Sequence, residues 1–422
     1  MYHSNSPHFG ELRQYLDSIP VIETHEHFTK YKENKDAVGF VLDNYYWTDF
    51  VSAGGEEAPP DGLDARQKFE WFIRTYKRSD KTTNIRCVLE GLRQCWGVEN
   101  LDSFEDFQAL EKKLAERDAS VYDRMMEKMG IRAKIVDVFD LAPFVEGSET
   151  GYSKYCRFAL PIPIYHNLHS KQDLLILQNY LDRTITCLDD YLESLDNFFV
   201  KSIEFGVVCL KDQSAYRRSI AYGNPTRAEA ESAFNEIIFK PRDIFGDDRV
   251  RVLDDWIFHY ALRKAAKYGL PVQLHTGYMA GIRNDIVKTN AGHLIPTIEL
   301  HRDVQFALFH GNWPYMDEYL YIGKNYPNAY LDLCWVTSTD PVYSVELMKR
   351  AVMTVPHSKV FAFGGDTAMI EWVAGYLTLT KDVVASALAE LADSGWLDVE
   401  EAKRVAIDWF FNNPNEFYKL GL

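Results

Sequence analysis

The chain has 422 residues, of which 46% are hydrophobic and 14% aromatic, so it can bury a large core and is not an intrinsically disordered protein. Its formal net charge of −16 would repel nucleic acid and anionic membranes, so neither is expected as a main partner. No basic segment followed by an apolar one opens the sequence, and no apolar run is long enough to span a bilayer, which predicts a cytoplasmic protein.

The first predicted element is a strand close to the start of the sequence, in the stretch VIETHEHF. Side chains alternate between the two faces of a strand, so His25 and His27 would point to the same side. Neutral imidazole is a good ligand for zinc and related divalent ions, and two ligands from one strand lower the cost of ordering a site. Two solvated histidines at a strand end are the alternative, and the rest of the chain must decide between them.

Residues from about 29 to 130 predict an insertion that is mainly helical. The segment DARQKFEWFIRTYK carries Phe69, Phe72 and Ile73 at helical spacing. In SFEDFQALEKKLAE, Ser103 and the acidic residues after it resemble a helix cap. Gly54-Gly55 and Pro59-Pro60 mark a loop within the insertion.

Beyond the insertion, strands alternate with helical segments. Near-continuous apolar strands separated by helices predict a parallel sheet covered by helices. Together with VIETHEH they make eight units, which predicts an α/β protein with a (β/α)₈ TIM barrel, as one domain over residues 1–422; a doubly wound sheet is the alternative. The seven further predicted strands are residues 132–139, 157–162, 205–211, 271–276, 304–310, 329–335 and 359–366.

Polar residues end several of these strands. Lys211, His275, His310 and Asp366 each stand at the carboxyl end of a predicted strand, as the strand-one histidines do. These ends open on one face of a parallel barrel, where barrel enzymes carry their active sites. Taken singly, each residue has a simpler explanation: His275 or His310 as a core histidine, Lys211 as a lysine that extends to solvent, and Asp366 as a helix cap. Their shared position in successive units favours a site.

VIETHEHF followed by LHTG, LFHG and FGGD resembles the amidohydrolase superfamily of metal-dependent (β/α)₈ barrels. The resemblance extends from the first strand to the last. It implies that His25, His27, His275 and Asp366 bind a divalent metal, and that His310 is the strand-six histidine. It also implies that Asp366 handles a proton.

Within the superfamily, the layout is closest to uronate isomerases. The segments DNYYWTDFVSAG, FEWF and GLRQCWGVENLDSFEDFQAL resemble the helical insertion of those enzymes in order and composition. Two features depart from them: LPIPIYHN stands where their Arg-Pro-Asp element would follow strand three, and FGGDT differs from their last metal-side motif. His310 also fits the hydrolytic members better.

These residues predict a metal-dependent hydrolase of a small, carboxylate-bearing amide, ester or lactone. Asp366 would take a proton from the attacking water and pass it to the leaving group, and His310 would hydrogen-bond the polarised oxygen or donate a proton. Lys211 would either be carbamylated and bridge two metals or, as we favour, face a substrate carboxylate as a cation. The alternatives are a sugar-acid isomerase or a decarboxylase with the same site, and a barrel that binds a metabolite without catalysis.

Substrate contacts, the metal and the assembly are less sharply defined by the sequence. Zinc suits the histidine ligands best, and manganese, iron or nickel stay open. Six cysteines without Cys-x-x-Cys spacing are expected to be reduced core or surface residues. The C-terminal helices would cover the barrel or contribute to a contact in a homo-oligomer. Besides Lys211, the predicted substrate-binding residues are Tyr216, Arg217, Tyr278, Arg283 and Trp313.

Overall fold

The computed structural model describes the whole chain except residues 29–31, 35, 139–151, 167, 169, 182 and 240–246. Its eight strands form one parallel sheet in the order β1 to β8. The segment that follows β8 pairs with β1 and closes the sheet, since Thr24 N donates to Phe363 O at 3.0 Å and Asp366 N donates to His25 O at 3.0 Å. The predicted TIM barrel is thus confirmed, and the doubly wound alternative is wrong. The strands are β1 (Val21–Glu26), β2 (Ile131–Asp137), β3 (Cys156–Pro161), β4 (Val207–Asp212), β5 (Val272–Leu274), β6 (Phe306–Leu308), β7 (Ala329–Asp332) and β8 (Val360–Phe361).

Several strands are shorter than predicted at their carboxyl ends. The predicted strand 304–310 corresponds to β6, which ends at Leu308, and the predicted strand 359–366 corresponds to β8, which ends at Phe361. The last predicted residue of 132–139 lies outside the described residues. His310 and Asp366 therefore lie in the loops that follow the strands rather than in the ladder itself.

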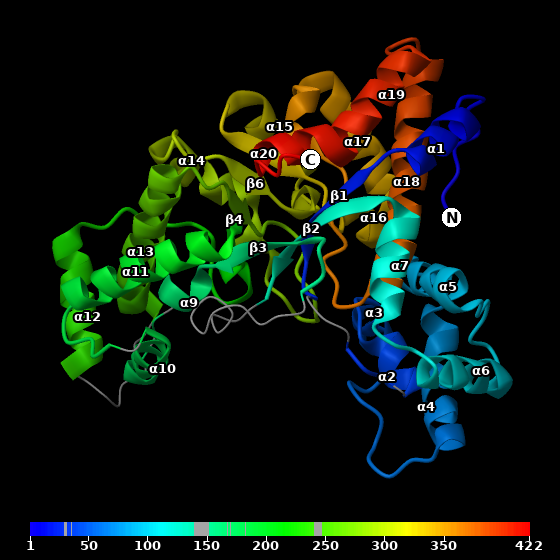
Figure 1. Ribbon diagram of the computed structural model, residues 1–422, viewed down its shortest axis with the longest axis horizontal. Helices are drawn as coiled ribbons and strands as arrows, with labels where there is room; N and C mark the ends of the chain where they lie inside the picture. The colour runs from blue at the N-terminus through cyan, green and yellow to red at the C-terminus, as the bar shows by residue number, and fades with distance from the viewer. Residues whose placement is uncertain are drawn as a thin grey trace.

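The helices that follow the strands cover the outside of the barrel (Figure 1). Parallel strands buried on both faces need this cover, and residues of both sheet faces are buried here. These helices are α9 (Pro163–His166), α10 (Lys171–Leu181), α11 (Leu188–Phe205), α12 (Arg227–Phe239), α13 (Asp247–Tyr268), α14 (Ile295–Leu300), α15 (Met316–Asn325), α16 (Val336–Thr339), α17 (Pro341–Thr354), α18 (Ile370–Asp393), α19 (Val399–Ile407) and α20 (Asn413–Phe417), and α1 (Phe9–Ser18) precedes β1. Short 3₁₀ turns lie at Ser214–Tyr216, Ile286–Thr289, Ala291–Leu294, His310–Asn312 and His357–Lys359, and a π turn lies at Asp408–Asn412.

Between β1 and β2, six described helices form a lobe beside the barrel (Figure 1). Capping residues determine where two of these helices begin. Ser103 and Asp106 form a reciprocal capping box at the start of α6, where the sequence predicted a cap, and Asp64 and Gln67 form another at α4. The six helices are α2 (Ala37–Leu42), α3 (Tyr46–Ser52), α4 (Ala65–Ser79), α5 (Thr83–Trp96), α6 (Phe104–Ala115) and α7 (Ser120–Met129).

Helix α18 joins this lobe to the barrel. Twenty of its 24 residues are buried, which is typical of a helix with partners on all sides. It runs against α5 at very close range: a Cβ added at Gly375 would lie 1.9 Å from Cys87 O, and one added at Gly91 would lie 2.1 Å from Glu371 O. The contact therefore requires glycine at both positions. A buried ion pair between Arg117 and Glu371 fixes the same junction.

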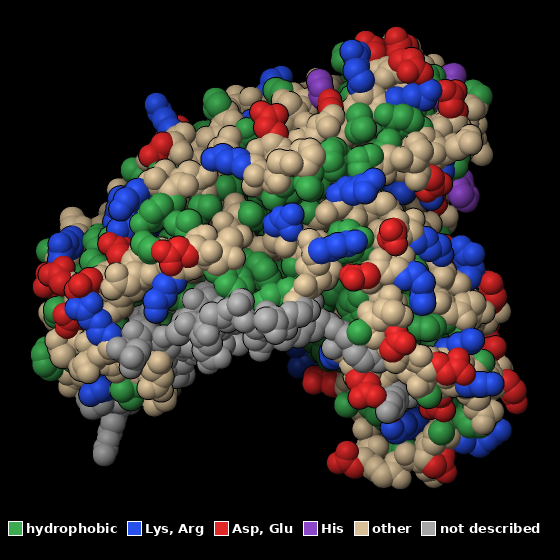
Figure 2. Space-filling view, viewed as in Figure 1, with side chains coloured by type: hydrophobic (Ala, Val, Ile, Leu, Met, Phe, Trp, Pro, Cys, Tyr) green, Lys and Arg blue, Asp and Glu red, His purple; other side chains and the backbone are tan. Residues whose placement is uncertain are grey.

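The surface is polar and mixed in charge. Figure 2 shows lysine and arginine side chains interspersed with acidic ones on the described part of this face, rather than gathered into one basic area. Of the helices that the structure describes, none combines the length and the apolar character that a membrane-spanning segment would need.

Candidate active site

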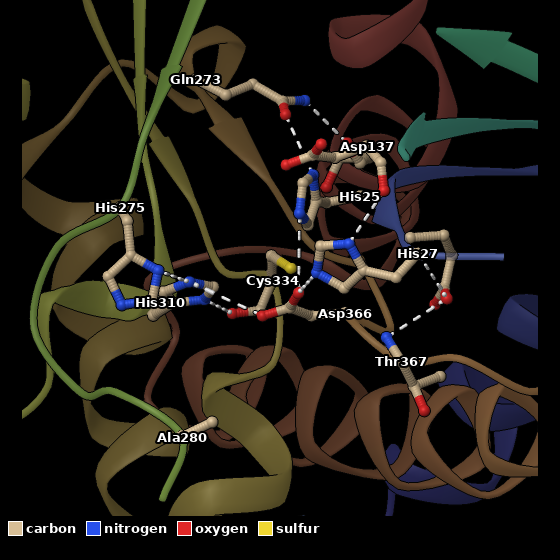
Figure 3. Close-up of polar contacts among 12 residues, drawn as sticks. His25, His27, Asp137, Gln273, His275, Ala280, His310, Cys334, Asp366 and Thr367 are labelled. Atoms are coloured by element: carbon tan, nitrogen blue, oxygen red, sulfur yellow. Dashed lines mark hydrogen bonds and ion pairs between the residues drawn. The ribbon is translucent and has the colours of Figure 1, made fainter. Parts of the chain in front are cut away.

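Four histidines and Asp366 meet at the carboxyl ends of the strands (Figure 3). The Asp366 carboxylate lies at their centre. Its Oδ1 is 2.8 Å from His27 Nε2 and 3.5 Å from His25 Nε2, and its Oδ2 is 3.7 Å from His310 Nε2. His275 joins through His310, because its Nδ1 lies 3.1 Å from His310 Nε2. The side chains of His25, His310 and Asp366 are buried, and that of His27 is 17% exposed.

Hydrogen bonds behind the rings set the tautomers of the histidines. His27 Nδ1 lies 3.0 Å from Asp137 O, and His310 Nδ1 lies 3.0 Å from Cys334 O, so each Nδ1 donates its proton to a carbonyl. In a neutral ring each Nε2 is then left with a lone pair that faces Asp366, whereas protonated His27 donates from its Nε2 to that carboxylate. This arrangement, with one ring nitrogen held by an acceptor behind it, is typical of metal-ligating histidines.

Gln273 settles the same question for His25. The Gln273 amide nitrogen donates to Thr24 O at 2.8 Å and to Tyr418 Oη at 2.9 Å, so its Oε1 is the atom that lies 3.0 Å from His25 Nδ1. His25 Nδ1 must therefore donate, and Nε2 carries a lone pair. That buried nitrogen has no hydrogen-bond partner among the described residues, and a carboxylate oxygen faces it. A cation between the two would satisfy both.

The contact between the rings of His275 and His310 also brings two acceptor atoms together. His275 Nε2 lies 2.9 Å from Tyr278 O and so donates to it, which leaves lone pairs on both nitrogens of the 3.1 Å contact between the two rings. Burial lowers the pKa of His310 to about 4 and the pKa of His275 well below its usual value. A shared proton is therefore absent at neutral pH, and a cation bound at His275 Nδ1 would relieve this contact.

The separations of these atoms also suit a metal. Two ligands that lie about 2.1 Å from one ion are roughly 3.0–3.4 Å apart, and the measured contacts run from 2.8 to 3.7 Å. Burial opposes the ionised form of Asp366, but the hydrogen bond from His27 and the nearby histidines outweigh it and hold its pKa well below the usual range. Burial lowers the pKa of His25, His275 and His310, whereas at His27 the hydrogen bond to Asp366 outweighs burial and raises the pKa. The donor set therefore offers an ionised carboxylate, three neutral imidazoles and His27, which would release its proton when a cation binds.

The backbone at the strand ends is unusual in the same region. His310, Trp335 and Asp366 follow β6, β7 and β8, and all three have left-handed φ angles of 64°, 65° and 52°. Non-glycine residues adopt this region at a cost, and such residues cluster at functional sites. His310 and Asp366 bring their side chains into the site at these turns, and Trp335 packs against His310 with ring centres 5.2 Å apart.

A cavity of about 480 Å³ opens from these groups. Lys211, Tyr216 and Arg217 line it, as does Tyr45, whose hydroxyl donates to the backbone carbonyl of Asp366. The Lys211 ammonium is buried and lies 3.7 Å from the centre of the Phe309 ring; burial lowers the pKa of this amine, although the carboxylate of Asp366 opposes the shift. The described residues lining the cavity are His25, His27, Tyr45, Pro161, Pro163, Lys211, Gln213, Tyr216, Arg217, His275, Ala280 and Asp366.

The other predicted substrate contacts lie further out. Tyr278 packs edge-on against Trp313, with ring centres 5.5 Å apart, and Arg283 is exposed on the same loop. None of the three is among the described residues that line the cavity. Their contact with a substrate stays a prediction.

The sequence carries an independent family signature. The sequence model of the Amidohydrolase family matches residues 216–371, a range that includes Arg217, His275, His310 and Asp366. This match confirms the resemblance to the amidohydrolase superfamily. With the barrel, it also confirms the expected amidohydrolase-type enzyme.

Known proteins agree with an amidohydrolase-type barrel. Protein fluG of Emericella nidulans is 31% identical over 178 residues, which are 40% of this chain and only 20% of that protein. The uronate isomerase of Thermotoga maritima has a similar structure, with a TM-score of 0.80 at 13% identity over 98% of each chain. The glucuronate isomerase of Caulobacter crescentus gives 0.76 at 16% identity, over 100% of this chain and 96% of that one. A proposed metal-dependent hydrolase of Lactobacillus casei gives 0.67 at 15% identity, over 97% and 98%.

Sequence reasoning missed four residues of this amidohydrolase-type site: Gln273, Asp137, Cys334 and Tyr45. Gln273 stands two positions before His275, so the alternation of side chains along a strand could have placed the two on one face. Asp137 ends β2, and Cys334 closely follows the end of β7. The criterion that identified Lys211, a polar residue at the carboxyl end of a strand, would have identified both. Tyr45 carries no such signal, because it reaches the site from the helical lobe.

Proposed function

We propose that the chain is a metal-dependent hydrolase of a small amide, ester or lactone that bears a carboxylate. One observation carries the proposal: the Nε2 atoms of His25 and His27 converge on the Asp366 carboxylate, and a hydrogen bond at Nδ1 orients each ring. These groups line a cavity whose wall also contains basic side chains. Zinc is the metal we favour because imidazole and carboxylate suit it, with manganese, iron and nickel as alternatives.

The protein residues have distinct proposed roles around that ion. His25, His27, His275 and Asp366 would hold it, His275 through Nδ1, and the ion would supply Lewis acidity toward a water molecule and a substrate carbonyl. Asp366 accepts the proton of the attacking water and returns it to the leaving group. His310 is neutral at pH 7, because burial lowers its pKa to about 4. Its Nε2 therefore accepts a hydrogen bond from the water and orients it rather than donating a proton.

Lys211 and Arg217 are proposed to bind the substrate carboxylate. Arg217 is exposed at the cavity wall, whereas the next arginine, Arg218, is buried and bound to Asp254 and Asp255 on α13. Lys211 is buried deeper, and we propose that it acts there as an unmodified ammonium rather than as a carbamate. The two cations would hold a small anion between the cavity mouth and the reacting carbonyl.

Metal content tests the proposal first. We expect elemental analysis of the purified protein to find close to one or two equivalents of a divalent metal, and His25→Ala to lose most of it because one fixed lone pair is gone. His301→Ala is the matched control, since His301 is also buried but precedes β6 at the other end of the strand. A folded wild-type protein that holds no metal and takes up neither zinc nor manganese would refute the proposed function.

The second prediction concerns Arg217. Replacing it by Ala should raise KM for a carboxylate-bearing substrate by about tenfold, the worth of one hydrogen bond to a charged group, with a smaller change in kcat. Steady-state kinetics on the best substrate from a panel of small amides, esters and lactones measures the effect. Arg302→Ala, an exposed arginine ahead of β6, should leave KM unchanged. A lower kcat at constant KM would mean that Arg217 does not bind the ground-state substrate.

A sugar-acid isomerase is the second candidate. The full-length likeness to glucuronate and uronate isomerases favours it, including the helical lobe that supplies Tyr45 to the cavity. Mass spectrometry in ordinary water separates the two: a hydrolase adds one molecule of water to its substrate and changes the total mass, whereas an isomerase leaves the substrate mass unchanged.

A further inference from the structure

Cys334 reaches the same carboxylate from the loop after β7. Its Sγ, a ring nitrogen of His310 and a carboxylate oxygen of Asp366 all lie within 4.8 Å of one another (Figure 3). The residue is fully buried, and the described part of the chain offers no hydrogen bond to its sulfur. We propose that Cys334 Sγ is a thiolate ligand of the divalent ion. This inference rests on the proposed metal site and adds a ligand of a different kind to it.

Backbone contacts hold the sulfur in place. Cys334 N donates to Asp332 Oδ1 at 3.0 Å, and the next residue, Trp335, donates from its backbone to Gly364 O at 3.0 Å. Gly364 also provides the space, because a Cβ there would lie 2.7 Å from Cys334 Sγ. Backbone hydrogen bonds of Cys334 and Trp335 therefore anchor the loop, and the segment after β8 leaves room for the sulfur two residues before Asp366.

A second observation points to the same position. His25 is buried, and its Nε2 lacks a hydrogen-bond partner among the described residues while it faces Asp366 from β1, which flanks the β8 segment on the side away from β7. Imidazole nitrogen and thiol sulfur thus both lie close to the Asp366 carboxylate, and the cluster offers donor atoms of three chemical types. The competing explanation is that Cys334 is only an apolar core residue, since it also packs near Ile135 and Phe361.

Ligation would change the charge and the selectivity of the site. The thiol releases its proton to solvent as the bond from sulfur to metal forms. The Cys334 thiolate and the Asp366 carboxylate together then balance the two charges of the ion, while the histidines stay neutral. A thiolate also favours zinc over harder ions such as manganese or magnesium. Cys334 would in this way narrow the range of metals that the histidines leave open.

Cobalt and X-ray absorption spectroscopy test the proposal without any need for turnover. Wild-type protein loaded with Co²⁺ should show an intense thiolate-to-cobalt charge-transfer band in the near ultraviolet. Cys334→Ser should still bind Co²⁺ but lack this band. Cys209→Ser is the matched control and should retain the band, since Cys209 is buried in the same apolar cluster but belongs to no candidate metal group of described residues.

Wild-type protein loaded with zinc gives the deciding measurement if Cys334→Ser does not fold. Zinc-edge absorption should show one sulfur at about 2.3 Å beside nitrogen and oxygen ligands at about 2.0–2.2 Å. Zinc that is bound in stoichiometric amount by nitrogen and oxygen alone would overturn the role of Cys334 and leave the proposed function standing. Failure of the wild type to bind either metal would overturn both.

Discussion

Asp366→Asn is expected to reduce kcat by about 10²–10⁴-fold, the usual worth of a positioned general base, and to weaken metal binding as well. Asparagine keeps the shape of the side chain but cannot accept the proton of the attacking water. Its amide could still donate to a histidine Nε2 in place of the lost ion, so the fold should survive. Kinetics with saturating metal, together with the metal content, measure the two effects separately.

The matched control for this variant is Asp340→Asn. Asp340 caps the start of α17, where asparagine serves equally well, so both activity and metal content should be retained. If Asp366→Asn binds its full metal complement and retains kcat within a factor of ten, Asp366 is not the proton acceptor. The role would then pass to another group that faces the same water.

Arg117→Met is expected to lower the free energy of unfolding by about 3–5 kcal/mol, the loss typical when one partner of a buried ion pair is removed. Arg117 Nε and Nη2 donate to the two carboxylate oxygens of Glu371 at 2.6 and 3.0 Å, and both side chains are 0% exposed. Without the guanidinium, the Glu371 carboxylate stays buried without its counter-ion. Chemical denaturation, followed by the circular dichroism of the helices, measures the change.

Two companion variants sharpen this result. Lys77→Met breaks the exposed pair with Asp102 in the same lobe and should cost no more than about 1 kcal/mol. The double variant Arg117→Met/Glu371→Leu should recover much of the lost stability, because the uncompensated carboxylate is gone. A loss below about 1 kcal/mol in Arg117→Met alone would show that the pair does not hold the lobe to α18.

The fold was predictable because its units repeat. Eight apolar stretches separated by helices can bury both faces of their strands in few ways, and the strand-end residues had to meet on one face of a barrel. The strand ends were less predictable. Asp366 and His310 end apolar runs in the sequence, but the ladder stops earlier, at Phe361 and Leu308, and both residues lie in the following loops with left-handed backbone angles. No local pattern in the sequence indicates that change.

Contacts across the barrel were also beyond the sequence. Arg217 and Arg218 are adjacent and chemically identical, yet only one lines the cavity, because Asp254 and Asp255 on a distant helix bind the other. In the same way, Gln273 holds His25 from a strand almost 250 residues away. Such pairs are set by how strands meet in space, and a single sequence carries no record of them.

The burial of α18 also bears on the order in which the molecule forms. Residues 83–96 of the lobe pack against residues 370–393, so the lobe cannot complete its packing until residues 370–393 have left the ribosome. Contacts that span such distances along the chain form slowly, because the intervening loop must first be closed. The apolar side of α5 stays uncovered during that interval, which makes it the surface on which the nascent protein would depend most on chaperones.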